Sequence, residues 1–169
     1  MKKAPPFHTI HSALQYAAPV DHWVTALKFQ QKLVYARLLS ALLLETLLPL
    51  QTTKPDLLIP MPLHRQRLCE RGYNQSLEIA RSIAKKLAIP LALDECQRIL
   101  ATAPQASMPA AERRKNVRNA FWISLTLKGK HVIIVDDVVT TASTVTELAR
   151  ALRLAGVIRV DVWCCARTA

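Results

Sequence analysis

Glycine is scarce in this sequence, which has only Gly72, Gly129 and Gly156 among its 169 residues. A P-loop of the form GxxxxGK[ST] and a dinucleotide fingerprint of the form GxGxxG both need glycines within a few positions of one another. The three glycines here lie far apart along the chain. This spacing excludes both kinds of nucleotide-binding loop.

Cysteine pairs of the CxxC type are also missing. The four cysteines are Cys69, Cys96, Cys164 and Cys165, and only the last two are close in sequence. This arrangement suggests neither a zinc site nor a disulfide framework. We therefore expect buried or partly buried thiols in a reducing compartment, with Cys164 and Cys165 packed at a strand end.

Long apolar runs are absent as well. The longest, SALLLETLLPL (40–50), is interrupted by Glu45 and Pro49 and fits a buried helix better than a bilayer span. Lys2 and Lys3 are followed by prolines and polar residues, where a secretory signal would have an apolar core. We expect a cytoplasmic protein without membrane insertion.

Acidic residues are few compared with basic ones. There are 12 Asp and Glu against 23 Lys and Arg, which gives a formal net charge of +11. A surface of this kind favours anionic partners such as nucleic acid, a membrane face or a polyphosphate. The basic residues are concentrated in HRQRLCER (64–71) and RRKNVR (113–118).

The patterns that are present predict one α/β domain. Hydrophobic residues make up 51% of the chain, which is typical of a globular protein. Apolar periodicity predicts strands at 9–17, 57–61, 120–125, 132–135 and 157–165, and helices at 21–48, 74–88 and 145–155. A break in the first helix is expected near Gln30–Gln31, and residues 101–118 read as an irregular loop with some helix. Alternating strands and helices favour a largely parallel sheet, with the three tryptophans mostly in packing roles.

The stretch HVIIVDDVVTTAST (131–144) carries the strongest chemical signal. It places Asp136 and Asp137 at the carboxyl end of an apolar strand, where open α/β sheets bind ligands. A hydroxyl-rich loop follows, and Thr144 and Glu147 have capping-box spacing at the start of a helix. A helix N-terminus suits a phosphate, and a carboxylate pair suits a diol or a hydrated divalent cation. Ribose 5-phosphate offers both groups, so the pattern predicts a site for it.

This stretch closely resembles the phosphoribosyl pyrophosphate (PRPP) motif of type I phosphoribosyltransferases. A second block, PMPLHRQRLCERGYNQ (60–75), resembles the P-x-P…R…RG[FY]NQ signature of the ComF/GntX family. Leu27–Lys28–Phe29 is similar to that family's early LK[FY] element. A segment from Arg98 to Phe121, containing Gln105, Glu112, Arg113 and Asn116, is similar to its "R…Q…ER..N…AF" region.

The resemblance implies a type I phosphoribosyltransferase fold. It also implies a small N-terminal hood and helices over residues 1–55 and a PRPP-binding core over 56–169. It assigns the ribose hydroxyls and Mg²⁺ to Asp136 and Asp137. The 5-phosphate would be bound by Thr140, Thr141, Ala142, Ser143 and Thr144. Pyrophosphate would be bound by Arg65, Arg67, Arg71, Gly72 and Asn74, with His64 a further candidate. A mobile loop would carry Arg98, Gln105 and Arg113.

The activity implied is transfer of a phosphoribosyl group from Mg-PRPP to an unidentified acceptor, with release of pyrophosphate. No general base is identifiable in the sequence. The resemblance also implies a context of competence or DNA utilisation. An alternative is therefore a non-catalytic protein of the same fold, which binds single-stranded DNA or a DNA-uptake partner through its basic surface.

Two departures from the family pattern stand out. Family members usually begin with a cysteine-rich zinc-binding segment, which this sequence does not contain, so no zinc is expected. The phosphate loop usually reads T-T-G-x-T, but here Ala142 replaces the glycine. If the loop keeps a positive φ, alanine costs on the order of 1 kcal/mol, whereas a helix that starts early could accept it without strain.

Overall fold

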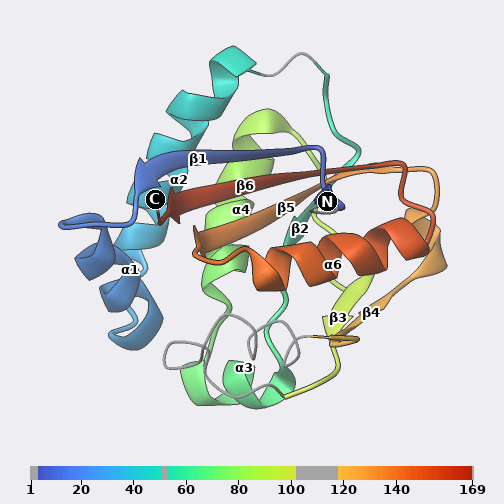
Figure 1. Cartoon of the computed structure of the whole chain (residues 1–169). Coiled ribbons are helices and arrows are strands. Elements are labelled where there is room, and N and C mark those ends of the chain that lie inside the picture. The colour runs from blue at the N-terminus through green and yellow to red at the C-terminus, as the bar shows by residue number, and fades with distance from the viewer. Residues whose placement is uncertain (1–3, 51–52, 102–117, 169) are drawn as a thin grey trace.

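The computed structural model describes residues 4–50, 53–101 and 118–168. Four parallel strands form its main sheet in the order β1-β6-β5-β2 (Figure 1). These strands are β1 (Thr9–Gln15), β2 (Leu57–Pro60), β5 (His131–Val139) and β6 (Arg159–Arg167). A separate antiparallel pair consists of β3 (Cys96–Arg98) and β4 (Phe121–Ile123).

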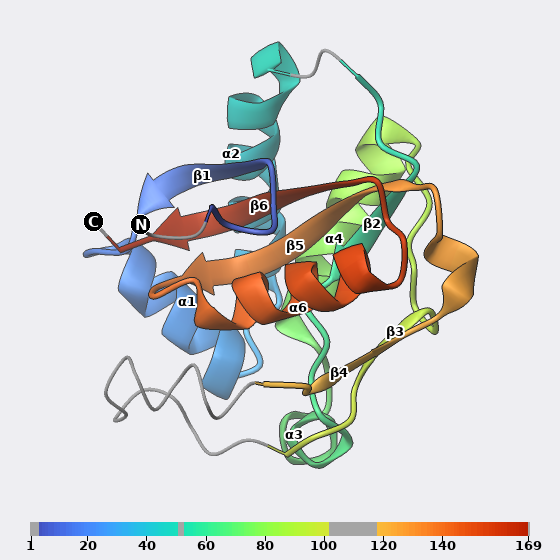
Figure 2. The ribbon, with the colours of Figure 1, turned by 45° about the vertical axis from the view of Figure 1, so that its right-hand side comes forward.

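Helices cover both faces of this sheet. The α-helices are α1 (Val20–Phe29), α2 (Val34–Leu47), α3 (Arg65–Arg71), α4 (Gln75–Leu87) and α6 (Ser143–Leu154), and the 3-10 turns are η1 (Leu48–Leu50) and η3 (Leu125–Leu127). Figure 2 shows α6 on one face and α1, α2 and α4 on the other. No helix in the described ranges is long and apolar enough to cross a membrane.

The apolar run of β5 explains this two-sided arrangement. Alternate side chains of a strand point to opposite faces, so Val132 and Ile134 pack with α6 while Ile133 and Val135 pack with α2 and α4. All four are buried. Near-continuous burial of this kind is typical of parallel strands covered on both sides, and it confirms the predicted α/β class.

Several predicted elements are confirmed with shifted ends. The expected break in the first helix lies at residues 30–33, where Gln31 has φ 54°. The strand predicted at 132–135 runs from His131 to Val139, because β6 continues to pair with it. Two short elements, α3 and β3, were not expected. Most of the loop predicted over 101–118 lies outside the described residues.

Burial of the sulfur-containing and aromatic side chains follows the expectation only in part. Cys164 and Cys165 are fully buried, as expected, and Trp163 is 4% exposed. The expectation is wrong for Cys69, which is exposed on α3, and for Trp122, which is 48% exposed. Trp122 lies on the two-stranded β3-β4 ribbon, where less of the protein is available to cover it.

The N-terminal residues contribute to the main sheet. β1 is its edge strand and pairs in parallel with β6, from Thr9 opposite Asp161 to Gln15 opposite Arg167. The division into a hood over 1–55 and a core over 56–169 stays a prediction. The first strand of the predicted hood, β1, is part of the main sheet, so the two regions share that sheet.

Candidate functional site

The two adjacent aspartates lie inside β5, not after its end as predicted, and both are buried. Asp136 is 7% exposed and Asp137 is 2% exposed. The neighbouring strand β2 pairs with β5 only as far as Pro60, opposite Val135. Asp136 and Asp137 therefore follow the last residue of β5 that pairs with β2. Because β2 ends there, space is left beside the two aspartates. Ser76 at the start of α4 donates its hydroxyl to Asp136 Oδ1 at 3.1 Å.

Lys28 provides the counter-charge for this pair. It lies in the last turn of α1, and its Nζ is 2.6 Å from Asp137 Oδ2. Sequence patterns gave no role to Lys28. The only signal was its place in Leu27–Lys28–Phe29, because a contact between residues 28 and 137 depends on how α1 packs on the sheet.

The three charges set the pKa values of the site. Burial raises the pKa of Asp136 well above its usual value, and the neighbouring Asp137 charge raises it further. Burial opposes ionisation of Asp137 too, but the Lys28 charge and contact outweigh it and its pKa is lowered. For Lys28, burial favours the neutral form, and the charge of Asp137 outweighs that effect and raises its pKa. The site thus holds an ion pair beside a carboxyl group that keeps its proton more readily.

A cavity of about 610 Å³ opens in front of the aspartates. Cationic side chains outnumber acidic ones in its described lining, where the aspartates are joined by Glu70, whose Oε2 is 3.4 Å from Arg67 Nη1. Its charged and polar lining includes Lys28, His64, Arg67, Arg71, Arg98, Asp136, Asp137 and Thr144. The cavity therefore suits a ligand that carries hydroxyl groups at one point and negative charge at another.

The three arginines predicted to bind pyrophosphate lie on a short helix, α3. Arg67 and Arg71 line the 610 Å³ cavity. Arg71 also lies 5.5 Å from the centroid of the Phe29 ring and donates to the Gln75 side chain. Arg65 points elsewhere and lines a second cavity of about 510 Å³. The structure brings two of the three predicted arginines to the aspartates.

Gly72 and Asn74 position these arginines. Gly72 ends α3 with φ 81°, a left-handed conformation that favours glycine. Asn74 caps α4 by accepting from Ser76 N at 2.9 Å and Leu77 N at 3.3 Å. Its Nδ2 donates to Met61 O at 3.0 Å, which holds the end of β2 against the helix. Both residues line the second cavity, so their contribution to the first is structural.

Two other side chains complete the cationic wall. His64 caps α3 by accepting from Gln66 N at 3.3 Å, and it lines the larger cavity. Arg98 ends β3 and lines both cavities, with its guanidinium 5.8 Å from the Phe121 ring centroid. Burial lowers the pKa of Arg98, and the charge of Asp136 opposes that change. Arg98 was predicted on a mobile loop together with Gln105 and Arg113, which lie outside the described residues.

The predicted phosphate loop leads from β5 into α6. Ala142 has φ 56°, so the loop keeps a positive φ although glycine is absent. Thr141 and Ser143 hydroxyls are 3.0 Å apart, and Thr144 lines the cavity. Thr140, Thr141, Ala142 and Ser143 are not among the residues that line it. The cap residue of α6 is Ala142, whose methyl group cannot accept from the helix amides, so an anion can take that place.

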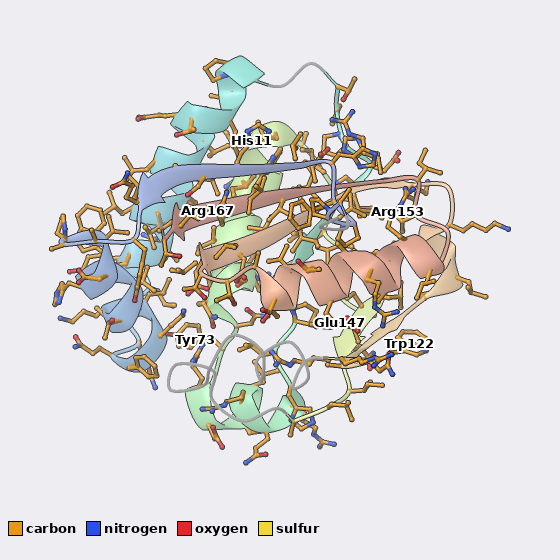
Figure 3. All side chains as sticks on the ribbon, viewed as in Figure 1. His11, Tyr73, Trp122, Glu147, Arg153 and Arg167 are labelled. Atoms are coloured by element: carbon orange, nitrogen blue, oxygen red, sulfur yellow. The ribbon has the colours of Figure 1, made fainter. Side chains whose placement is uncertain are left out.

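The predicted capping box of Thr144 and Glu147 is wrong. Glu147 accepts instead from Asn119 N at 2.7 Å and from Arg150 at 2.7 and 3.0 Å. Figure 3 shows Glu147 on the side of α6 that faces the β3-β4 ribbon. Arg150 also donates to the Asn119 side chain at 2.9 Å. This cluster fixes the chain just before β4, so Glu147 holds a loop in place.

Comparison with known proteins agrees with this geometry. The phosphoribosyl transferase domain family matches residues 74–168, more than half of the chain. The DNA utilization protein YhgH of Escherichia coli O157:H7 is 38% identical over 99% of this chain and 76% of its own length. Competence protein F of Haemophilus influenzae is 31% identical, with the same shares covered.

Solved structures include a purine phosphoribosyltransferase from Pyrococcus horikoshii. It is 20% identical over 78% of this chain and 82% of its own, with a TM-score of 0.46. The two sequence relatives match over nearly the whole chain at above 30% identity. This chain has the type I phosphoribosyltransferase fold and belongs to the YhgH/ComF family of phosphoribosyltransferase-domain proteins.

Proposed function

We propose that this protein binds Mg-PRPP in the 610 Å³ cavity and transfers its phosphoribosyl group to an acceptor, releasing pyrophosphate. The observation that carries the proposal is the buried pair Asp136–Asp137, which shares one cavity with Arg67, Arg71 and Arg98. Ribose hydroxyls and phosphates are the two kinds of group that such a cavity would pair with at the same time.

Each part of PRPP has a candidate partner. The ribose 2- and 3-hydroxyls would donate to Asp136 and Asp137. The 5-phosphate would lie at the N-terminus of α6, beside Thr144 and the hydroxyls of Thr140, Thr141 and Ser143. The pyrophosphate would face Arg67 and Arg71, because a guanidinium can donate two parallel hydrogen bonds to phosphate oxygens.

The aspartates also fit a magnesium ion held together with its substrate. Mg²⁺ is commonly bound by one or two carboxylates and by the phosphates of the ligand. Asp137 is already in contact with a cation, Lys28, which shows that this position accommodates positive charge. When bound, Mg²⁺ would neutralise charge on the departing pyrophosphate.

The chain's own contribution would be positioning and electrostatic stabilisation. Attack by an acceptor nitrogen at ribose C1 passes through a transition state with positive charge on the sugar. The carboxylates below the ribose would stabilise that charge, and Arg67, Arg71 and Arg98 would stabilise the leaving group. No described side chain needs to form a covalent bond to the sugar, and the identity of the acceptor is left open.

The biological setting follows from the relatives. Their names refer to DNA utilization and to competence, so we propose that the reaction or the binding event serves DNA uptake or use. A second candidate function, supported by the net charge of +11, is non-catalytic binding of single-stranded DNA. The two functions are not mutually exclusive.

Titration calorimetry with Mg²⁺ and PRPP tests the first proposal. The Asp136→Asn/Asp137→Asn variant should lose at least about 100-fold in affinity, because two charge-assisted hydrogen bonds disappear. Asp94→Asn, at an exposed aspartate outside the cavity, is the matched control and should bind like the wild type. Equal binding by the double variant and the wild type, with both folded by circular dichroism, would overturn the proposal.

A further inference from the structure

Helix α2 presents an apolar stripe to solvent as well as to the core. Its inner face, with Ala36, Leu39, Leu43 and Leu47, is buried. Its outer face carries Val34, Leu38 and Leu48, which are 64%, 37% and 51% exposed. A helix that is apolar on opposite sides is usually covered on both. The upper end of α2 extends beyond the sheet in Figure 1, and no described element lies over its outer face.

The outer stripe has the spacing of a helix-pairing seam. Its positions are Val34, Leu38, Ala41, Glu45 and Leu48, which are separated alternately by four and three residues. This alternation keeps side chains on one line facing a partner helix. Arg37 lies beside the line and is exposed as well. The stripe therefore has the form of a contact surface for another helix.

Some residues on and beside this stripe lie symmetrically about Ala41, while Leu38 has its mirror position at Leu44, which is only partly exposed. Arg37 comes four residues before Ala41 and Glu45 four residues after it, while Val34 and Leu48 lie seven residues before and after. In an antiparallel pair of identical helices with a two-fold axis at Ala41, each residue faces its mirror position. Arg37 then meets Glu45 of the other copy, and Val34 meets Leu48. Ala41 meets itself, where a small side chain allows close approach.

We propose that this chain forms a two-fold dimer through antiparallel contact of α2 with α2 of a second copy. Two-fold contacts between identical subunits are isologous, so a patch must complement itself. The Arg37–Glu45 pair does so in charge and the Val34–Leu48 pair in apolar character, and Leu38 would face the partly exposed Leu44. Within the described ranges neither Arg37 nor Glu45 has an ion-pair partner in its own chain.

The dimer would leave the PRPP cavity open, because the residues lining that cavity come from other parts of the chain. One helix stripe per copy is a small interface. Such an interface lies at the low end of the range for specific contacts, so we expect a dissociation constant in the micromolar range. The inference does not depend on the proposed enzymatic function.

Sedimentation velocity over a range from about 1 to about 500 µM tests the dimer, since this range brackets micromolar affinity. Wild type should shift from monomer to dimer. Arg37→Glu alone and Glu45→Arg alone should each weaken dimerisation at least about tenfold. Each variant puts two like charges opposite one another at positions 37 and 45, and the two-fold axis repeats this contact in the dimer. Combining Arg37→Glu with Glu45→Arg should restore it. Lys86→Glu, at an exposed position on α4, is the control and should leave dimerisation unchanged.

Disulfide trapping provides a second, geometric readout. Ala41→Cys, in a background with Cys69→Ser to remove the exposed native thiol, should form an intermolecular disulfide under mild oxidation, because the two copies of residue 41 meet at the axis. Two results would overturn the proposal. One is a wild type that stays monomeric over the whole range. The other is a dimer that is insensitive to both charge reversals and gives no cross-link at residue 41.

Discussion

At the residue scale, Lys28, Asp136 and Asp137 compensate one another's charges within the fold. Two buried carboxylates side by side would repel, and taking each out of water has a cost. Lys28 neutralises Asp137 at 2.6 Å, and Asp136 has its pKa raised by burial and by the Asp137 charge. The site therefore stays folded while it keeps two acceptor groups ready for a ligand.

Asp136→Asn should make the protein more stable above neutral pH. Because the folded-state pKa of Asp136 is raised, the folded protein holds this proton more tightly than the unfolded chain does. The resulting stabilisation is complete below the unfolded-state pKa and is lost as pH rises through the folded-state pKa. Asparagine keeps an acceptor for Ser76 and cannot ionise. The thermal unfolding midpoint of the variant should exceed that of the wild type by a few degrees at about pH 8, with the difference closing towards about pH 4. A constant difference across this range would contradict the prediction.

Ala142 tests how much strain the phosphate loop holds. Its φ of 56° costs a non-glycine residue about 1–2 kcal/mol. Replacing Ala142 with glycine removes this cost, but the greater entropy of glycine in the unfolded state lowers the stability by about 0.4–1 kcal/mol. Ala142→Gly should therefore raise the free energy of unfolding by up to about 1 kcal/mol in urea titrations. Ala88→Gly is a matched control, because Ala88 has φ 50° at the end of α4, away from the cavity.

The two glycine variants also separate strain from ligand contact. Both should gain similar stability, but only Ala142→Gly can change PRPP affinity by giving phosphate a closer approach. An affinity gain of up to about tenfold in Ala142→Gly alone would locate the phosphate at this loop. An identical response of both variants in PRPP titrations would place the phosphate elsewhere.

At the scale of elements, the site results from strands of unequal length and from where their neighbours begin. β2 stops opposite Val135, and the chain then turns into α3, whose arginines face the part of β5 that β2 leaves uncovered. β1 is held at the opposite ends of the strands. There Asp161 accepts from Thr9 N and Oγ1 at 3.1 and 2.7 Å, from Arg159 Nε at 2.8 Å, and contacts His131 Nε2 at 2.8 Å.

Asp161→Asn should loosen β1 and destabilise the protein by about 2–4 kcal/mol, because buried donors lose a charged acceptor. Burial would raise the pKa of Asp161, but hydrogen bonds from Thr9, His131 and Arg159 outweigh it and lower the pKa. Its contribution is therefore present above the unfolded-state pKa and is lost as pH falls through the folded value. Wild type should lose this stability on acidification, and the variant should not.

Hydrogen exchange locates the effect of that variant. Amides of Thr9–Gln15 should lose protection in Asp161→Asn much more than those of β5, since β1 is an edge strand bonded only to β6. Asp94→Asn, at an exposed position, should leave the exchange pattern unchanged. Uniform loss of protection over the whole sheet would show that Asp161 supports the core in general and not the edge strand.

At the scale of the whole molecule, acidic and basic groups are distributed unequally. The net charge is +11, yet the two acids of the site are buried and line a cavity whose other charged side chains are mostly basic. A polyanion on the outer surface would meet mostly basic groups, while a compact ligand with hydroxyls would reach the acids. The DNA proposal therefore does not require the buried acids, whereas the PRPP proposal does.

Single-stranded DNA should bind weakly and with strong salt dependence. For about four phosphate contacts, with a slope of about −0.7 for each, affinity should fall roughly 50-fold between about 50 and about 200 mM salt. Fluorescence anisotropy of a labelled oligonucleotide measures this, and the Asp136→Asn/Asp137→Asn variant should bind DNA as the wild type does. Binding that is absent at low salt, or is lost in that variant, would argue against an outer DNA surface.

The sequence by itself determined the α/β class, the apolar strand β5 and the presence of an acidic pair next to a hydroxyl-rich loop. These features follow from local periodicity and short-range hydrogen bonding, so neighbouring residues reveal them. The sequence left the positive φ at Ala142 as an open alternative, because alanine normally disfavours this conformation and only the tertiary context of the loop imposes it.

Only the tertiary structure decided which distant residues meet. Lys28 reaches Asp137 because α1 packs against the sheet end. Arg67 and Arg71 reach the cavity while Arg65 does not, because a short helix, unseen in the sequence pattern, turns successive arginines to different sides. Glu147 accepts from Asn119 N and Arg150 and does not form the predicted capping box with Thr144. Packing of the segment before β4 against α6 brings the Asn119 amide to this carboxylate. Contacts of this kind depend on long-range packing, which local patterns do not encode.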